Sequence, residues 1–163
     1  MPVEIVEFEL VRRDWSKIAR DTQRKVLETV LNEGDAQKAV DIVKNAVKDL
    51  KSGNVPLSEV AISTQLRKGI EGYDIKSPEL GAVRKAIKEG RKRPDELQGA
   101  LISYVITRHG SSISDKAELE EFAKDYDADY YINNQVLPAT MRILKELNFS
   151  EEELKGLGTQ RKL

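Results

Sequence analysis

The chain has 163 residues, which suffices for one domain or two small lobes. Hydrophobic residues make up 39% and charged residues 34%, so we expect a modest core under a highly charged surface. A net charge of −1 argues against a uniformly basic nucleic-acid binder and leaves only local basic patches. Without cysteine, disulfides and thiolate metal sites are excluded, and the single histidine, His109, cannot form a zinc site alone. No apolar run reaches membrane-span length and no signal peptide opens the chain, so we expect a cytoplasmic protein.

The first third of the sequence predicts a strand and then a helix hairpin. VEIVEFEL, from Val3 to Leu10, alternates apolar and acidic residues, which is typical of a short strand. Asp14 can cap a helix from Trp15 to about Asn32, with Gly34 as its stop, and Asp35 can cap a second helix to about Leu50. We expect inward faces made of Ile18, Val26, Val30 and Leu31, and of Ala39, Ile42, Val43, Ala46 and Leu50.

The middle of the chain mixes strands and helices. Proline suits the first helical turn, so Ser77-Pro78 predicts a helix start. ALISYVIT is rich in β-branched residues and predicts a strand. In chain order we expect a turn at 52–56, a strand at 60–66, a helix from 77 to about 89, a strand at 100–107, a turn at 108–112 and a short helix at 115–124.

A long returning helix is predicted from YDADYYINNQVLPATMRIL, residues 126–144. Asp127 or Asp129 can cap its first turn. Pro138 should bend or divide the helix, because proline has no N–H to donate. A capping box of Ser150 and Glu153 predicts a last short helix. The buried face of the long helix would comprise Ile132, Val136, Ala139, Ile143 and Leu147.

These elements predict an α+β fold that is mostly helical. An N-terminal helix hairpin is followed by a small mixed αβ lobe and by a long C-terminal helix that returns to the hairpin. The expected parts are a strand at 1–10, the hairpin at 11–53, the αβ lobe at 54–125, the C-terminal helices at 126–155 and a flexible tail at 156–163.

Two segments carry a resemblance to one family. YDADYYINNQVLPA, from Tyr126 to Ala139, resembles the last long helix in the thumb of archaeal family B DNA polymerases. FELVRRDWSKIARDTQRKVLETVL, from Phe8 to Leu31, resembles the passage from the palm to the thumb of these enzymes. Both occur in the family's order and at roughly its spacing. The resemblance implies a thumb-like part of a DNA-directed DNA polymerase, which holds primer-template duplex through phosphate and minor-groove contacts.

The resemblance also implies that this chain is not catalytic by itself. Two-metal nucleotidyl transfer needs carboxylates that hold both ions, and the family carries them on palm motifs of the SLYPS and DTD type, which are absent here. Asp127 and Asp129 are better explained as capping residues than as metal ligands. His109 lies in a predicted turn without a nucleophile motif. We therefore expect no cofactor in this chain, and Mg²⁺ in the palm of a large catalytic polymerase subunit.

The candidate DNA contacts begin with two basic segments. Arg12 and Arg13 could hold phosphates or pair with neighbouring carboxylates, and the resemblance favours phosphate because this segment lies beside the primer strand in the family. TQLRK, residues 64–68, resembles a segment that touches the duplex backbone. Lys68 occupies the family's basic position, whereas Arg67 stands where Thr is usual, so Thr64, Arg67 and Lys68 form either a phosphate contact or a solvated strand.

Further candidates lie in the lobe and in the returning helix. The basic run contains Arg84, Lys85, Lys88, Arg91, Lys92 and Arg93, partly neutralised by Glu89, Asp95 and Glu96, and reads as a phosphate-binding or a solvated face. Tyr130, like Tyr104, Tyr126 and Tyr131, could pack or stack on bases. Gln135, with Asn133 and Asn134, could reach the minor groove or cap local backbone.

Partners and alternatives remain open from sequence alone. Because the chain begins with Met1, it could be a natural small subunit of a split polymerase, or a piece cut from a larger enzyme. The tail QRKL, residues 160–163, carries only the first half of a sliding-clamp-binding motif. With no predicted neighbour for the first strand, Val3, Ile5, Phe8 and Trp15 should be more exposed in the isolated chain than in the complete enzyme, while Trp15 itself is expected to pack in the core or between lobes. The alternatives are a stand-alone interaction domain that uses the helix hairpin, and a hydrolase, for which no nucleophile arrangement is visible.

Overall fold

The computed structural model describes residues 15–66 and 77–146. The chain divides into two compact units, one made of Met1–Val55 with Ala128–Leu163 and the other of Pro56–Asp127. The predicted strand at 3–10 and the short helix after Ser150 lie outside the described residues. Within the described residues, no helix has both the length and the apolar character needed to cross a membrane.

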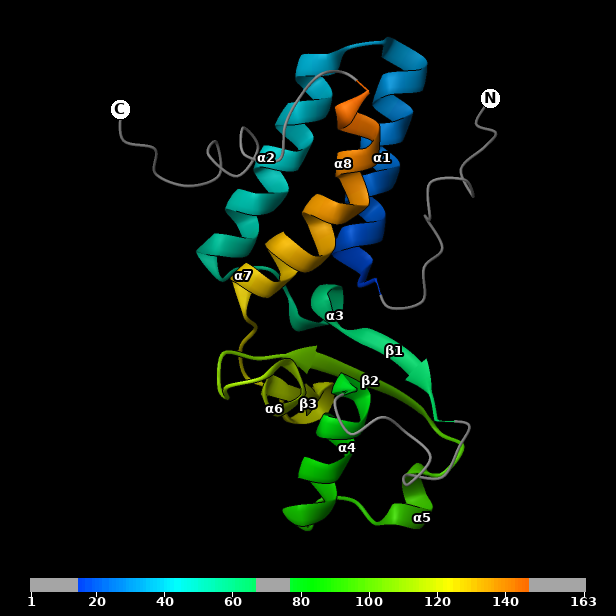
Figure 1. Cartoon of the computed structure of the whole chain (residues 1–163), viewed down its shortest axis with the longest axis vertical. Helices are drawn as coiled ribbons and strands as arrows, with labels where there is room; N and C mark the ends of the chain where they lie inside the picture. The colour runs from blue at the N-terminus through cyan, green and yellow to red at the C-terminus, as the bar shows by residue number, and fades with distance from the viewer. Residues whose placement is uncertain (1–14, 67–76, 147–163) are drawn as a thin grey trace. The chain divides into compact units, whose positions relative to one another are not determined.

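The first unit is built on a helix hairpin of α1 (Lys17–Glu33) and α2 (Ala36–Ser52), which run side by side (Figure 1). Gly34 ends α1 in the left-handed conformation, at φ 60°, and its N–H bonds the carbonyls of Thr29 and Val30. Asp35 starts α2, because its carboxylate accepts a hydrogen bond from the Lys38 N–H at 3.0 Å. The predicted hairpin and its turn signals are thus confirmed.

The start and one face of α1 differ from the prediction. The residue before the helix is Ser16 rather than Asp14, so α1 begins at Lys17. Leu31 was expected to face inward but is 55% exposed. At about 100° per residue, Leu31 falls on the side of the helix opposite Thr22 and Val26, which are buried. In α2, Ala39, Val43, Ala46 and Leu50 are buried as predicted, together with Val40 and Val47, and Ile42 is half-buried.

Trp15 belongs to the core of this unit. Its side chain is 2% exposed and clusters with Ala19 and Ala139. The Arg20 guanidinium donates a hydrogen bond of 2.8 Å to the Trp15 carbonyl, which fixes the chain just before α1. The predicted core packing of Trp15 is therefore confirmed, and an indole that is 2% exposed here leaves almost nothing for a larger enzyme to cover.

The returning helix packs against both hairpin helices and is divided into three parts. These are α7 (Ala128–Tyr131), a π-helical segment η4 (Ile132–Val136) and α8 (Leu137–Lys145). Pro138 opens α8, and its missing N–H leaves an upstream carbonyl without a helical donor, which accounts for the irregular turn before it. The predicted buried residues Ile132, Val136, Ala139 and Ile143 are buried, and Leu147 lies outside the described residues.

The second unit contains an antiparallel sheet in the order β1-β2-β3. Its strands are β1 (Ile62–Gln65), β2 (Leu101–Ile106) and β3 (Ala117–Leu119). Tyr104 of the central strand is opposite Ile62 on one side and Leu119 on the other, and all three are buried. The helical segments of the unit are α3 (Leu57–Val60), α4 (Pro78–Lys88), α5 (Pro94–Leu97), α6 (Ile113–Lys116) and the 3-10 helix η3 (Glu120–Phe122).

Two predictions for this unit have different outcomes. The α4 start is confirmed, since the Ser77 hydroxyl accepts a hydrogen bond from the Leu80 N–H at 3.3 Å and Pro78 follows. The helix expected over 115–124 is wrong: α6 ends at Lys116 and β3 follows it. Ala117 and Leu119 are buried on the sheet while Glu118 between them is not, which is the period of a strand. The mostly helical α+β class is the observed one.

Gly81 provides a test of how α4 packs against α6. A Cβ at this position would lie 2.1 Å from the backbone oxygen of Ser114. Alanine normally gains about 1 kcal/mol over glycine inside a helix, but here backbone must move, at a cost of about 1–3 kcal/mol. We predict that Gly81→Ala lowers the free energy of unfolding in urea titrations. Lys88→Ala, on the exposed side of α4, is the control and should change it little; a stabilised G81A protein would contradict the packing.

Candidate nucleic-acid interface

The structure describes six of the ten predicted DNA-contact residues. Arg12, Arg13, Arg67 and Lys68 lie outside the described residues, so their predicted roles are untested. The other six are distributed over both units and are considered unit by unit: Thr64, Arg84, Lys85 and Lys88 in the αβ unit, and Tyr130 and Gln135 in the helical unit.

Arg84 and Lys88 are the most available cations of the basic run. They are one turn apart on α4, so their side chains lie on the same side of the helix. Both are exposed, and neither forms an ion pair with the described part of the chain. The opposite side of α4 is buried through Leu80, Ala82, Val83 and Ala86. Packing of that apolar side therefore fixes the two cations toward solvent.

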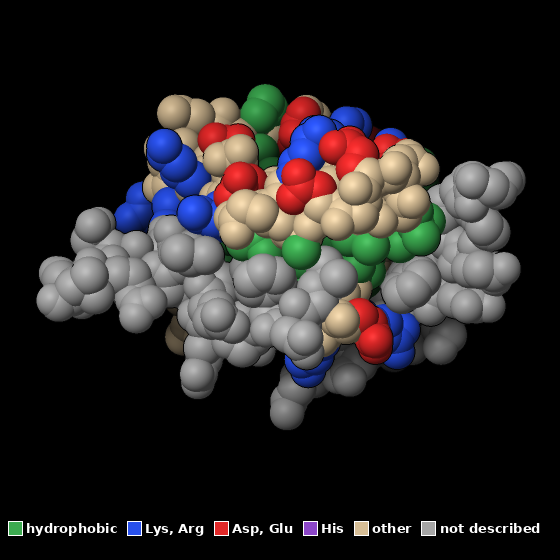
Figure 2. Space-filling model, turned by 90° about the horizontal axis from the view of Figure 1, so that it is seen from above, with side chains coloured by type: hydrophobic (Ala, Val, Ile, Leu, Met, Phe, Trp, Pro, Cys, Tyr) green, Lys and Arg blue, Asp and Glu red, His purple; other side chains and the backbone are tan. Residues whose placement is uncertain are grey.

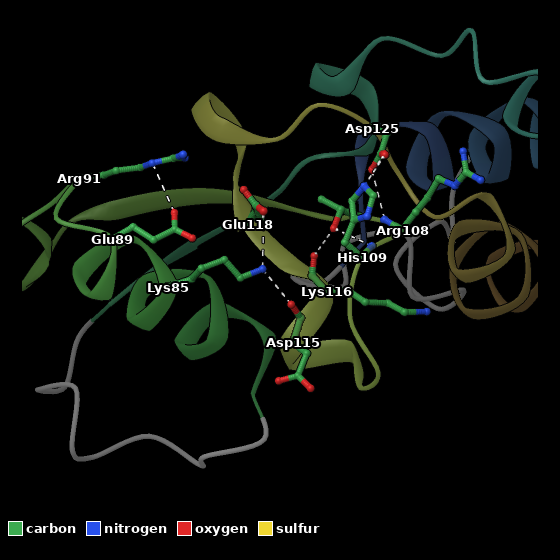
Figure 3. A network of polar contacts seen from close by, with 10 residues as sticks. Lys85, Glu89, Arg91, Arg108, His109, Asp115, Lys116, Glu118 and Asp125 are labelled. Atoms are coloured by element: carbon green, nitrogen blue, oxygen red, sulfur yellow. Dashed lines mark hydrogen bonds and ion pairs between the residues drawn. The ribbon is translucent and has the colours of Figure 1, made fainter.

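Lys85 has a structural partner instead. Its ammonium donates a hydrogen bond of 2.8 Å to the Asp115 carbonyl and lies 3.6 Å from the Glu118 carboxylate (Figure 3). The side chain thereby links α4 to the end of α6 and to β3. As a phosphate contact Lys85 would have to give up these bonds, so the structure does not support its predicted role.

The remaining cations of the run also meet carboxylates. Arg91 is 3.3 Å from Glu89 and its guanidinium stands 4.5 Å from the centre of the Phe122 ring. Lys92 is 3.0 Å from Glu121, and Arg93 is 3.2 Å from Asp95. Neutralisation within the run was predicted, whereas Glu118 and Glu121 reach it from a distant part of the sequence. The run thus contributes two unpaired cations among the described residues rather than six.

Charge on the helical unit is mixed as well. On the face seen from above, acidic and basic side chains are interspersed over the helices (Figure 2). The first half of α1 carries a cluster of charged side chains that the sequence analysis did not identify. Asp21 bridges Lys17 and Arg24 at 2.8 Å each. Partial burial raises the pKa of the Asp21 carboxyl, but the Lys17 hydrogen bond and nearby cations outweigh it and lower that pKa overall. The sequence signal for this cluster is the position of Lys17 four residues before Asp21 and of Arg24 three residues after it.

Thr64 lies on β1 with limited access. It alternates with exposed neighbours and shares its side of the strand with buried Ile62 and Leu66. On the other side of the strand, the Ser63 hydroxyl is hydrogen-bonded to the Ser103 hydroxyl of β2 at 2.8 Å. The Thr64 side chain is half-buried, so its access to a DNA phosphate is limited. A contact between this strand and the DNA backbone would have to come from the edge of the sheet.

Gln135 is a correction to the predicted interface. Its side chain is 1% exposed, and its carbonyl oxygen accepts hydrogen bonds from both the N–H and the hydroxyl of Ser16, at 2.8 Å each. A residue in this position cannot reach a DNA groove. Instead, Gln135 accepts hydrogen bonds from the two donors of Ser16 at the start of α1. The Ser16 side chain itself does not cap an N–H of the helix.

The aromatic candidates are mostly packing residues. Tyr104, Tyr126 and Tyr131 are buried. Tyr130 is half-buried and meets Tyr131 edge to face, with ring centroids 5.0 Å apart. Among the tyrosines considered, only Tyr130 keeps enough exposure for a ligand contact, and its ring already has an aromatic neighbour.

The acidic and histidine candidates make local bonds. Asp127 pairs with Lys116 at 2.8 Å, and its N–H bonds the Ile106 carbonyl. His109 is 3.0 Å from Asp125, whose other carboxylate oxygen accepts from the Arg108 N–H (Figure 3). The described residues contain no group of three or more His, Cys, Asp or Glu side chains that could hold a metal ion. These bonds join the end of β2, the segment that follows it and the end of α6 to residues 125–127.

Comparison with known proteins identifies the family. Residues 6–147 match the model of DNA polymerase family B. A DNA polymerase of Thermococcus aggregans is 41% identical over 153 residues, which are 91% of this chain and 8% of that protein. A DNA polymerase of Methanocaldococcus jannaschii is 39% identical over 160 residues, 97% of this chain and 10% of that protein. The chain belongs to DNA polymerase family B.

A solved structure of the same family supports the fold. The family B DNA polymerase from the hyperthermophilic archaeon Pyrobaculum calidifontis aligns with a TM-score of 0.71 at 29% identity. The alignment covers 85% of this chain and 19% of that one. This chain thus corresponds to a limited region of its relatives, about a tenth of the length of the two curated polymerases.

The role of Gln135 yields a stability prediction. Gln135→Ala removes the acceptor for two buried donors of Ser16, and an unsatisfied buried donor costs about 1–3 kcal/mol. We expect a clear loss of unfolding free energy in denaturant titrations. Asn134→Ala, at an exposed neighbour in the same π-helical segment, is the matched control and should have little effect. Equal stability of the two variants would show that the Ser16 bonds are dispensable.

Proposed function

We propose that this chain is the thumb portion of a DNA-directed DNA polymerase. It holds primer-template duplex through phosphate and minor-groove contacts and is not catalytic alone. The observation that carries the proposal is family membership over residues 6–147 combined with a span of only about a tenth of the polymerase relatives. A fragment this short leaves room for one accessory domain and not for the complete enzyme.

The contacts in this proposal are made by arginine and lysine side chains. Arg84 and Lys88 supply one pair on α4, while Arg12, Arg13, Arg67 and Lys68 are assigned to the duplex through the resemblance. Arginine and lysine neutralise phosphates without reading bases, and such contacts set position rather than sequence. That suits a polymerase, which must hold any template equally well.

The chemistry belongs to a partner chain in this proposal. Mg²⁺ would be bound in the palm of a large catalytic subunit, because the SLYPS and DTD motifs are missing here. The described residues do not fit a two-metal site, since they contain no suitable acidic cluster. Whether the chain is a separate subunit of a split polymerase or part of a longer one, its function requires the palm. A sliding clamp is a further partner to test, with only half of its tail motif present.

One observation favours the alternative of a protein-interaction domain. Lys85, Arg91, Lys92 and Arg93 are occupied by carboxylates or by a carbonyl, so the basic run is weaker as a phosphate surface than its sequence indicates. If duplex binding depends on none of the exposed cations, the interaction role is the better account of this unit.

We predict weak, sequence-independent duplex binding that depends on salt. Each neutralised phosphate contributes a slope of about −0.9 in log K against log salt. Arg84→Ala with Lys88→Ala should therefore reduce the magnitude of the slope by about 2 and weaken binding equally for unrelated sequences, as measured by fluorescence anisotropy.

A charge-matched control separates contacts from net charge. Lys38→Ala with Arg93→Ala removes the same charge, but these two cations pair with Glu33 and Asp95. Their loss should leave the slope nearly unchanged. Equal effects of the two double variants would assign the binding to overall charge, and binding that ignores salt would refute phosphate contacts.

Catalytic dependence gives a second test. Primer extension by the purified chain with Mg²⁺ and dNTPs should show no product. Added to a family B polymerase that lacks its thumb, the chain should restore processive synthesis, and Phe8→Asp should block that rescue. Leu31→Asp, at an exposed leucine, is the control expected to rescue normally. Robust extension by the chain alone, or no difference with the thumbless enzyme, would refute the thumb proposal.

A further inference from the structure

A hollow of about 490 Å³ opens on the αβ unit beside the first half of β2. Leu97, Ile102 and Leu119 form buried apolar parts of its wall, and each is about 5% exposed. Leu101 stands at the same hollow with 72% of its side chain exposed. Leu101 is the most exposed large apolar side chain among the described residues, and packing within the unit does not account for it.

The strand beside the hollow has an open edge. β2 is paired with β1 from Leu101 to Tyr104, but its register with β3 starts only at Tyr104. Leu101, Ile102 and Ser103 therefore have no register partner in β3. Since the Leu66 N–H bonds the Ala100 carbonyl, the backbone groups of Leu101 point away from β1, toward this open side. An open edge next to an apolar hollow is the arrangement to which an extended segment can add as a further strand.

The charge around the hollow selects the occupant. Glu96, Glu120 and Glu121 line it, against Lys92 alone, which pairs with Glu121. One carboxylate oxygen of Glu96 accepts a hydrogen bond from the Arg93 N–H. Glu120, in contrast, has no ion pair in the described part of the chain. An excess of carboxylates repels the phosphates of a nucleic acid and attracts lysine or arginine. The surface is thus suited to a cationic, leucine-bearing protein segment and unsuited to duplex DNA.

We propose that the open edge of β2 at Leu101 and Ser103 binds an extended segment of a partner protein in which apolar residues alternate with lysine or arginine. The apolar side chains enter the hollow of Leu97, Ile102 and Leu119, and the cations meet Glu120, which has no ion pair among the described residues. This site is independent of the proposed duplex contacts on α4, because it takes the opposite charge.

The test uses the full chain and a short synthetic peptide of alternating leucine and lysine. NMR titration should shift the amide of Leu101 and the methyl groups of Leu97, Ile102 and Leu119, and should leave those of the helical unit unchanged. A leucine–glutamate peptide of equal length should not bind. Arg84→Ala with Lys88→Ala, which should weaken duplex binding, should leave binding of the lysine peptide unchanged, and this separates the site from the proposed function.

Matched variants decide the outcome. Leu101→Ser should weaken peptide binding about tenfold or more, because it removes exposed apolar contact area without changing the charge of the site. Leu31→Ser, at an exposed leucine of the helical unit, should not weaken it. Glu120→Lys should weaken binding and Glu28→Lys should not. Binding that survives Leu101→Ser, equal binding of the glutamate peptide, or shifts spread over both units would each overturn the proposal.

Discussion

The helical unit depends on two buried glutamines that exchange hydrogen bonds between the first helix and the returning one. Gln135 accepts from the N–H and the hydroxyl of Ser16, and Gln23 donates to the Ala139 carbonyl at 2.6 Å. Both side chains are about 1% exposed. An amide in an apolar interior is costly unless it is bonded, so these bonds fix how far α8 can slide along α1. The small side chains of Ala19 and Ala139 allow this close contact beside Trp15.

The π-helical segment allows Gln135 to make its hydrogen bonds to Ser16. Pro138 cannot donate a backbone hydrogen bond, so the helix before it is free to adopt a wider turn. Gln135 lies within that turn and points inward to Ser16, while Asn133 and Asn134 remain exposed. The sequence INNQVLP thus combines an irregular backbone with a single inward amide. This explains why a polar motif at a helix start is structural here and not a groove contact.

In the αβ unit, ion pairs between residues far apart in the sequence determine which cations remain unpaired. The cations of the basic run lie on α4 and on the loop after it, and β3 with η3 bring Glu118 and Glu121 against them. The unit therefore presents two different surfaces. Exposed cations remain on α4, and carboxylates surround an apolar hollow beside β2. These surfaces suit partners of opposite charge, which is compatible with a domain that holds duplex while it is attached to another protein.

The sequence alone determined the features that depend on local chemistry. The Asp35 and Ser77 caps, the stop at Gly34, the strand LISYVI and the division at Pro138 each follow from the conformational needs of a few neighbouring residues. Family membership also followed from sequence, since two motifs that bracket most of the chain carried the resemblance and the family match covers residues 6–147.

Only the tertiary structure decided the features that depend on distant partners. Burial of Trp15, inward placement of Gln135 and pairing of Lys92 with Glu121 join residues far apart in the chain. The strand at Ala117–Leu119 was missed because it is short and follows a helical turn, and only its register with β2 makes it a strand. Local pattern specifies an element, but the charge and access of a side chain depend on what packs beside it, because burial and ion pairing are properties of the assembled fold.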